Sequence, residues 1–404
     1  MSTVLRDDQL SRLLSSCDRQ GGTSRFTEGV NESLRVLLFC WSDRHDSMPL
    51  AHGRDAPSSR RHVGSVRGAE PLQTRAEDDE LSVAPAVELT EYDSDYPVEV
   101  PWLDLWHIFV IANDKGGAGK TSTVANLALM MLKKLQRGDP ERGVPADPDA
   151  RVLVIDLNAQ GNLTVHEFGA TPEQNDQGKA LYHALRDGSP LKPVTVRPGL
   201  DLVPGGGEWL KDDVASLYRR LRDRYDSNAD LRLLQCLLPI AGDYDYIFID
   251  TPPENPPLQR LAMGAGRWII TPSKTDRGSL DGVKGMSEQF RKVTKVNPLL
   301  TLLGVVLFAT GRKSTQIHQK AEARLREILG PSYYKFRTNI GHSEAVAQES
   351  RDIEGEPLVA LFDRAEGGDN SLPDTVRAVH EDYLALTDEV VERSAAIKQQ
   401  IEES

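Results

Sequence analysis

The chain has 404 residues, of which 39% are hydrophobic and 27% charged, and its formal net charge is −13. No apolar run approaches the roughly 20 residues that a membrane-spanning helix requires, and residues 1–18 lack the continuous apolar stretch of a secretory signal, so we expect a cytoplasmic protein. The acidic total excludes nucleic-acid binding driven by overall charge and leaves only a local basic surface for that purpose.

Residues 1–103 are predicted to form a largely disordered leader. They are rich in Ser, Arg, Asp and Pro, with a basic pair at Arg60 and Arg61 and an acidic run at 77–80. Two short apolar segments, 10–14 and 36–41, are too small to bury a core. A small DNA-binding module in this leader is the alternative, although no helix-turn-helix spacing supports it.

From residue 104 onward, apolar runs of strand length alternate with amphipathic stretches of helical length. This alternation is typical of a parallel sheet covered by helices. We therefore predict for residues 104–370 an α/β fold with a doubly wound, mostly parallel sheet and helices on both faces. The predicted strands are 107–112, 152–155, 200–203, 246–249, 268–271 and 302–308. The clearest predicted helices are 122–135, 208–224, 280–296 and 318–329, and 138–149 is expected to be a loop.

Residues 371–404 are predicted to form a C-terminal helix. Its apolar residues recur at helical spacing from about residue 373 and are Val376, Val379, Tyr383, Leu386 and Val390. Such a stripe is typical of a helix that packs on a sheet, and a coiled-coil arm is the alternative.

A phosphate-binding loop is predicted at 114–122, because a glycine-rich segment there follows an apolar strand and opens a helix. Glycines allow backbone amides to turn toward phosphate oxygens, Lys120 supplies positive charge, and the Thr121 hydroxyl is a candidate Mg²⁺ ligand. The general motif has glycine where this chain has Asp114. The candidate nucleotide-binding residues are Gly116, Gly117, Ala118, Gly119, Lys120, Thr121 and Ser122.

The string KGGAGKTS at 115–122 resembles the deviant Walker A motif of the ParA/MinD family of P-loop ATPases. That family places a second lysine directly before the glycine pair, and this lysine crosses a dimer interface to the partner's nucleotide. The resemblance implies that the protein binds ATP, forms a homodimer with ATP, and uses both Lys115 and Lys120 in hydrolysis.

Residues 247–253, IFIDTPP, are similar to the Walker B segment of the same family. An apolar strand that ends in a carboxylate suits a hard cation, which prefers oxygen ligands and keeps several waters. The resemblance implies that Asp250 holds the water shell of Mg²⁺, and a strand-ending turn residue is the alternative.

Residues 154–164 resemble the family's switch motif, with Asn158 in place of its second Asp and Ala159 in place of its Pro. In the family this Asp positions or activates the attacking water, whereas an amide orients a water but cannot accept its proton. We therefore expect Asn158 to occupy the catalytic position, with slow hydrolysis and intact ATP binding. Asp156 is a further candidate contact of the Mg²⁺ shell, and capping of the turn is the alternative.

Two later segments follow in the family's order: 200–205 resembles its third strand and 339–345 its late segment near the switch. The resemblance extends over about 106–361. It implies a ParA-type protein that partitions plasmid or chromosomal DNA or positions another cargo. The same resemblance implies a ParB-type partner protein and association with the nucleoid through non-specific DNA binding.

Other members of the family require features that this sequence lacks. A reductase similar to the nitrogenase iron protein needs paired cysteines for an iron–sulfur cluster, but Cys236 is the single cysteine of 104–370. A MinD-like protein needs a basic amphipathic terminal helix, whereas 381–404 is acidic, so we expect no membrane partner. The alternatives that stay open are an ATP-sensing regulator or scaffold with little or no hydrolysis, favoured by Asn158, and a MinD-like positioning protein.

The predicted helix 280–296 offers a candidate basic face for DNA phosphates. Its apolar stripe consists of Val283, Met286, Phe290 and Val293. The cations on another side are Lys284, Arg291 and Lys295, with Arg312, Lys313 and Arg337 expected nearby. Because Glu288 lies on the same helix, a solvated face without a ligand is the alternative.

Overall fold

The computed structural model describes residues 100–138, 145–311, 314–331, 333–349, 361–364, 367–369 and 371–403. Residues 1–99 of the predicted leader, and with them the predicted disorder, lie outside the described residues, as do Arg312 and Lys313 of the predicted basic face. None of the helices in the described ranges is long and apolar enough to cross a membrane.

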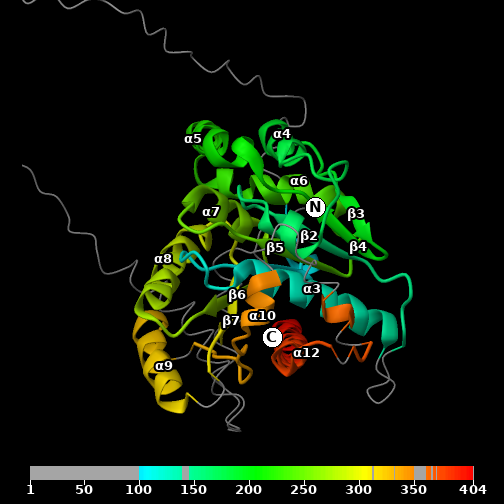
Figure 1. Ribbon diagram of the computed structural model, residues 1–404. Coiled ribbons are helices and arrows are strands. Elements are labelled where there is room, and N and C mark those ends of the chain that lie inside the picture. Colours follow the sequence, from blue (N-terminus) through cyan, green and yellow to red (C-terminus); the bar gives the residue numbers. More distant parts are fainter. Residues whose placement is uncertain are drawn as a thin grey trace, which may run out of the picture.

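A seven-stranded sheet forms the centre of the fold, in the order β3-β4-β2-β5-β1-β6-β7 (Figure 1). Neighbouring strands are parallel except for the antiparallel pair of β3 and β4. The predicted α/β class with a doubly wound, mostly parallel sheet is thereby confirmed. The strands are β1 (Ile108–Ile111), β2 (Val152–Asp156), β3 (Val194–Arg197), β4 (Leu200–Val203), β5 (Tyr246–Asp250), β6 (Trp268–Ser273) and β7 (Thr301–Leu307).

Helices cover both faces of the sheet because successive strand side chains point to opposite sides. In β1, Ile108 and Val110 join one hydrophobic cluster, whereas Phe109 and Ile111 join the other. The first cluster packs beneath α4 (Lys179–Asp187), α5 (Val214–Tyr225), α6 (Arg232–Ala241), α7 (Pro256–Ala265), α8 (Arg277–Val293) and α9 (Thr315–Leu329). The second packs beneath α3 (Lys120–Arg137) and α12 (Asp374–Glu402).

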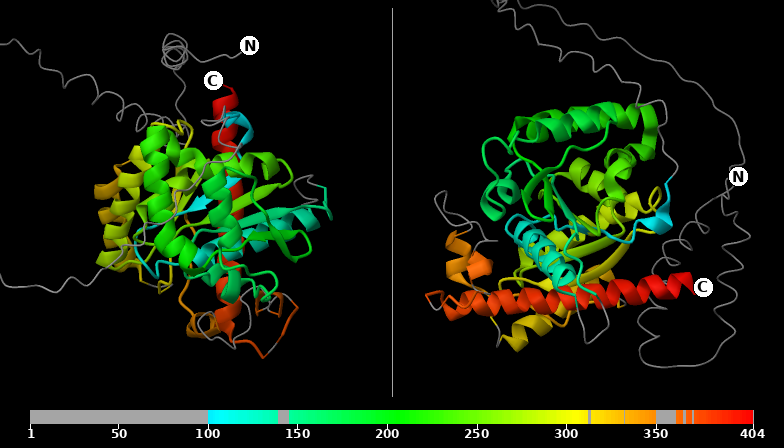
Figure 2. Two further views of the ribbon diagram at one scale, coloured as in Figure 1. Left: turned by 90° about the horizontal axis from the view of Figure 1, so that it is seen from above. Right: turned by 90° about the vertical axis from the view of Figure 1, so that its right-hand side faces the viewer.

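The C-terminal helix α12 runs along the face that α3 covers (Figure 2). Its predicted stripe is buried in the hydrophobic cluster of that face, where Val376, Leu386 and Val390 are fully covered. The short α10 (Glu344–Glu349) contacts α12. The remaining short elements are η2 (Trp102–Asp104), η3 (Leu163–Glu167), η4 (Trp209–Asp213) and η5 (Asp226–Leu231).

The structure contains elements that the sequence pattern did not predict. The edge strand β3 is only partly buried and pairs with β4 through a tight turn in which Gly199 has φ +76°. Helices α4, α6 and α7 are also additional; α6 is short, mostly apolar and contains Pro239, which is unfavourable inside a helix. The predicted helix 208–224 is divided into η4 and α5, and α8 begins earlier than predicted because Asp276 caps it.

Candidate nucleotide site

The predicted phosphate loop crosses the edge of the sheet where the parallel strands end. It leaves β1 after Ile111 and enters α3 at Lys120. Gly117 and Gly119 have φ of +71° and +94°, a conformation that favours glycine. A Cβ at position 119 would also lie 2.5 Å from the Phe308 ring. The loop therefore brings the free amides of a helix amino terminus to this edge, an arrangement that suits an anion.

Lys120 lies inside this loop rather than in solvent. Its side chain is 5% exposed, and its Nζ donates a hydrogen bond to the Lys115 carbonyl over 3.1 Å. Burial lowers the pKa of Lys120, while the nearby carboxylates of Asp250 and Asp114 raise it. The Lys115 side chain is exposed. The two predicted lysines thus share one loop, one pointing inward and one accessible to a ligand or a second molecule.

Thr121 and Asp250 meet directly, as the two predicted motifs require. The Thr121 hydroxyl donates to Asp250 Oδ2 over 2.8 Å. Asp250 is fully buried, and burial, followed by the neighbouring Asp156 carboxylate, raises its pKa to about 8 although Lys120 lowers it. Among the described residues, no donor reaches Asp250 Oδ1. A buried carboxylate oxygen without a donor is costly, and a hydrated cation would satisfy it.

Asp156 lies beside Asp250 in the register of β2 and β5. Its Oδ1 accepts from the Asn158 amide, and its Oδ2 accepts from the amide and hydroxyl of Thr164. Burial raises the pKa of Asp156 to about 6, against the opposing effect of these hydrogen bonds. Both oxygens therefore cap the turn that follows β2, and a contact of Asp156 with the Mg²⁺ shell stays a prediction.

Asn158 is part of the same turn and is 8% exposed. Its Oδ1 accepts the Gln160 amide over 3.0 Å, and its carbonyl accepts the amides of Gly161 and Gly206. The side chain of Asn158 thus stabilises the turn that follows β2.

Glu167 is a buried carboxylate of the site that the sequence pattern did not single out. It lies on the π-helix η3, and its Oε1 accepts the Ser122 hydroxyl over 3.0 Å. Within the described part of the chain, its Oε2 has no hydrogen-bond donor. Burial raises the pKa of Glu167 to about 7. Glu167 therefore joins the first turn of α3 to the segment after the predicted switch.

Asp114, which replaces the glycine of the general motif, is held by the neighbouring loop. Its Oδ1 accepts the Gln259 Nε2 over 2.9 Å and the Glu254 amide over 3.1 Å. Gln259 also donates to the Pro252 carbonyl. The departure from glycine thus creates a link between the phosphate loop and the segment after β5, which sequence reasoning had not identified.

The predicted basic face lies on α8. Val283, Met286 and Val293 of the predicted stripe are buried, whereas Phe290 is only half-buried. The cations Lys284, Arg291 and Lys295 are exposed, and Lys295 follows the last residue of α8, Val293. Arg337 instead forms ion pairs with carboxylates of α12, which are Glu389 and Glu392.

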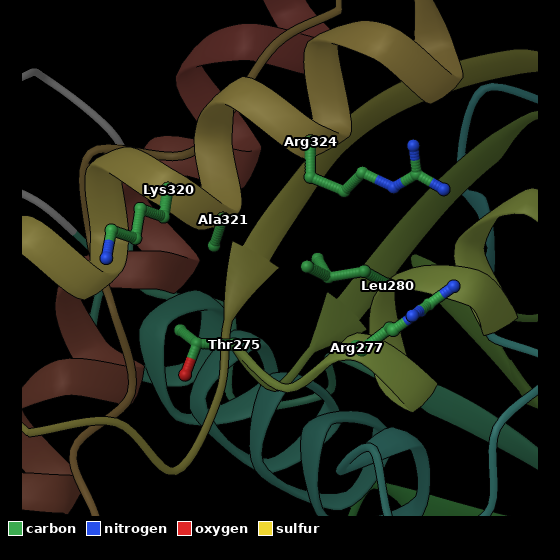
Figure 3. Close-up of a pocket in the computed structure, with 6 residues that line it drawn as sticks. All are labelled: Thr275, Arg277, Leu280, Lys320, Ala321 and Arg324. Atoms are coloured by element: carbon green, nitrogen blue, oxygen red, sulfur yellow. The ribbon is translucent and has the colours of Figure 1, made fainter.

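A hollow of about 410 Å³ lies between α8 and α9 (Figure 3). The guanidinium groups of Arg277 and Arg324 extend to the same side of it, with Leu280 between them (Figure 3). The lining residues are Thr275, Arg277, Leu280, Lys320, Ala321 and Arg324. Asp281 lies 3.7 Å from Arg277 and 3.6 Å from Arg324, so it offsets part of the positive charge.

The chain is similar to known proteins. A family model described as an AAA domain matches residues 106–302. The chain is 30% identical over 234 residues to the chromosome-partitioning ATPase Soj of Thermus thermophilus. This match covers 55% of this chain and 77% of that protein. It is 28% identical over 297 residues to the chromosome partitioning protein ParA of Caulobacter vibrioides, and this match covers 71% of this chain and 94% of that protein. The solved structure of pnob8 ParA has a TM-score of 0.48 and 20% identity, covering 71% of this chain and 98% of the other.

Proposed function

The chain belongs to the ParA/MinD family of P-loop ATPases, and from this premise we propose that it binds ATP with Mg²⁺, dimerises in the ATP state and hydrolyses ATP slowly. The observation that carries the proposal is the convergence of Lys120, Thr121 and Asp250 at the carboxyl edge of the sheet. A ParA-type role in DNA partitioning or cargo positioning, with a ParB-type partner, is the biological function that this chemistry would serve.

The residues at the site suit Mg²⁺ bound together with a nucleotide. Within the described ranges, no group of three or more His, Cys, Asp or Glu residues is arranged to hold a metal ion. Such a group is not required, because Mg²⁺ keeps several waters and takes its other oxygens from one or two side chains and the phosphates. Thr121 and the donor-free Oδ1 of Asp250 are the side-chain oxygens available for this purpose. When bound, Mg²⁺ neutralises charge on the phosphates.

The protein's own groups would perform the remaining work. The amides of 116–121 and the ammonium of Lys120 bind phosphate oxygens and hold them in place. Asn158 orients a water but cannot take its proton, so hydrolysis relies on positioning and on charge neutralisation.

The first test is the affinity for ATP. Lys120→Ala removes the buried ammonium, so we expect ATP binding in the presence of Mg²⁺ to be lost in an equilibrium titration. Lys179→Ala, which removes an exposed lysine from α4, is the control and should bind as the parent does. Equal affinity in Lys120→Ala and the parent would show that the phosphates bind elsewhere.

The second test is the oligomeric state. ATP should drive dimerisation and ADP should not, because the contact of Lys115 with the partner's nucleotide involves the γ-phosphate. Sedimentation of Lys115→Ala with ATP should then show a monomer. A dimer of parent strength in this variant would reduce Lys115 to a loop residue.

Non-specific DNA binding is proposed for the exposed side of α8. Arg277, Lys284 and Arg291 recur at seven-residue spacing and so share one side of the helix. Lys320 and Arg324 of the adjacent α9 lie at the same hollow as Arg277. The triple variant Lys284→Ala/Arg291→Ala/Lys295→Ala should weaken DNA binding and reduce its salt dependence. An unchanged salt dependence would assign the DNA contact to another surface.

A regulator or scaffold that senses ATP without turnover is the second candidate. It is supported by Asn158, whose side chain is engaged in the turn after β2. Phosphate release in a single turnover separates the two functions, since a scaffold would retain intact ATP.

A further inference from the structure

The segment that carries Lys115 lies directly against the first half of α8. The Asp114 amide donates to the Gly282 carbonyl over 3.2 Å. Asn113 Nδ2 donates to the Ser279 carbonyl over 3.3 Å, and the Lys115 amide donates to Asn113 Oδ1 over 2.9 Å. Helix α8 therefore binds the loop backbone at Asp114 and also the side chain of Asn113, which in turn accepts the Lys115 amide.

Glycine at position 282 permits this close approach. A Cβ there would lie 2.3 Å from Asn113 Oδ1 and 2.7 Å from both the amide nitrogen and the Cβ of Lys115. At Gly285 it would lie 2.6 Å from Asp114 Oδ2, the end of a side chain. At Gly278 the nearest atom of Lys115 is its Cε at 3.7 Å, an ordinary contact, and the nearest atom of all is Asp276 Oδ1 at 3.3 Å, the end of a side chain that can shift slightly. Inside a helix glycine is less favourable than alanine, so the helix itself gives no reason for glycine at 282.

α8 has little freedom to yield to such a Cβ. Val283 and Met286 are buried in the hydrophobic cluster beneath it, and Asp276 caps its first turn by accepting the Ser279 amide. An added methyl at 282 would therefore displace the loop at Asn113–Lys115 rather than the helix.

We propose that Gly282 is a positioning residue that sets the backbone of Lys115, from which its exposed side chain reaches the nucleotide bound by a second copy of the chain. This inference rests on the proposed ATP-dependent dimer and adds the element that orients its lysine. A long flexible side chain reaches a distant phosphate reproducibly only from a fixed backbone. Because α8 also carries the proposed DNA-binding cations, the same helix connects that surface with Lys115.

The test compares Gly282→Ala with Gly278→Ala, the same substitution one turn earlier on the same helix. In sedimentation with ATP, Gly282→Ala should weaken dimerisation at least tenfold, whereas Gly278→Ala stays within twofold of the parent. ATP affinity at protein concentrations that keep the chain monomeric should fall less than dimerisation in Gly282→Ala and should not change in Gly278→Ala. Lys120 Nζ would lose its hydrogen bond to the Lys115 carbonyl, but its ammonium and the amides of 117–121 remain available to the phosphates.

A second readout does not depend on nucleotide. Hydrogen exchange of the peptide 112–118 in the nucleotide-free protein should become at least tenfold faster in Gly282→Ala, because the Asp114 amide loses its fixed acceptor. If Gly282→Ala does not fold, Gly285→Ala takes its place. It should show a smaller change of the same kind, because Gly285 faces the carboxylate end of Asp114 rather than backbone.

The outcomes separate this inference from the proposed function. If Lys115→Ala abolishes the dimer while Gly282→Ala dimerises and exchanges as the parent does, the positioning role is wrong and the ATP-dependent dimer stands. If the parent does not dimerise with ATP, the proposed function is wrong, and the exchange of 112–118 alone decides whether Gly282 fixes the loop. A loss of monomer ATP affinity that equals the loss of dimerisation would also overturn the positioning role.

Discussion

Replacing Glu167 by glutamine is expected to make the metal-free protein increasingly more stable than the parent as the pH rises. The parent carboxyl group is buried, its pKa is raised to about 7 by burial, and one of its oxygens has no donor among the described residues. Glutamine keeps an oxygen that can accept the Ser122 hydroxyl but carries no charge at any pH. The substitution therefore removes the ionisation while keeping the shape.

The magnitude follows from proton linkage. A carboxyl group whose pKa is higher in the folded than in the unfolded chain binds more protons when folded, so its ionisation destabilises the fold as the pH rises above about 4.5. With a folded pKa of about 7, the cost is about 1.4 kcal/mol at pH 5.5 and about 3.4 kcal/mol at pH 8. The free energy of unfolding of Glu167→Gln relative to the parent should thus increase by about 2 kcal/mol between these two pH values.

The assay is urea unfolding at 25 °C in buffer with a chelator, because a bound cation would neutralise the carboxylates at this site. Glu173→Gln serves as the control. The pKa of this exposed glutamate is lowered by its own backbone amide and by Thr171, so its replacement should give no gain with rising pH. The test rests on how the stability difference between Glu167→Gln and the parent changes with pH, because any pH-independent cost of burying the new amide is the same at every pH. A difference between Glu167→Gln and the parent that stays constant from pH 5.5 to 8 would refute the assignment of a buried charge to Glu167.

Three further predictions concern the loop, the switch and the C-terminal helix. Gly119→Ala should destabilise the protein by about 1–3 kcal/mol in thermal unfolding and abolish ATP binding, because φ is +94° at this position and the new Cβ would clash with the Phe308 ring. An unchanged melting temperature would show that alanine causes no strain at position 119. Asn158→Asp should speed phosphate release with saturating ATP, each tenfold gain lowering the barrier by about 1.4 kcal/mol; equal rates would assign the water to another residue. Leu386→Ala should lower the free energy of unfolding in urea by about 2–5 kcal/mol, because this leucine of α12 is fully buried. A decrease below about 1 kcal/mol would mean that the packing of α12 contributes little to stability.

The sequence predicted the central sheet well because its strands are apolar runs buried on both faces. It also placed Lys120, Thr121 and Asp250 correctly at strand and helix ends, since the carboxyl ends of parallel strands share one edge. The edge strand β3 escaped prediction because its residues are only half-buried and alternate weakly. Helix α6 escaped because it is only ten residues long, is mostly apolar and contains Pro239, a residue that is unfavourable inside a helix.

The rest of the site depends on contacts that no local pattern encodes. Glu167 reaches Ser122 only because a π-helical turn follows the switch segment, and Gln259 reaches Asp114 only because α7 begins beside the phosphate loop. The sequence is compatible with Asp156 as a contact of the Mg²⁺ shell or as a turn cap, and only the structure reveals the three donors from the turn that bind its carboxylate. Residues far apart in sequence decide each of these features.

The pairing of α3 with α12 has a consequence for how the protein is made. More than 200 residues of chain separate Arg137, where α3 ends, from Asp374, where α12 begins. At about 5–20 residues per second, translation takes roughly 10–50 s to cover that distance. Throughout this interval the apolar side of α3 that α12 will cover stays exposed on the nascent chain, which makes it a natural contact for a chaperone and a site of aggregation when synthesis is slowed.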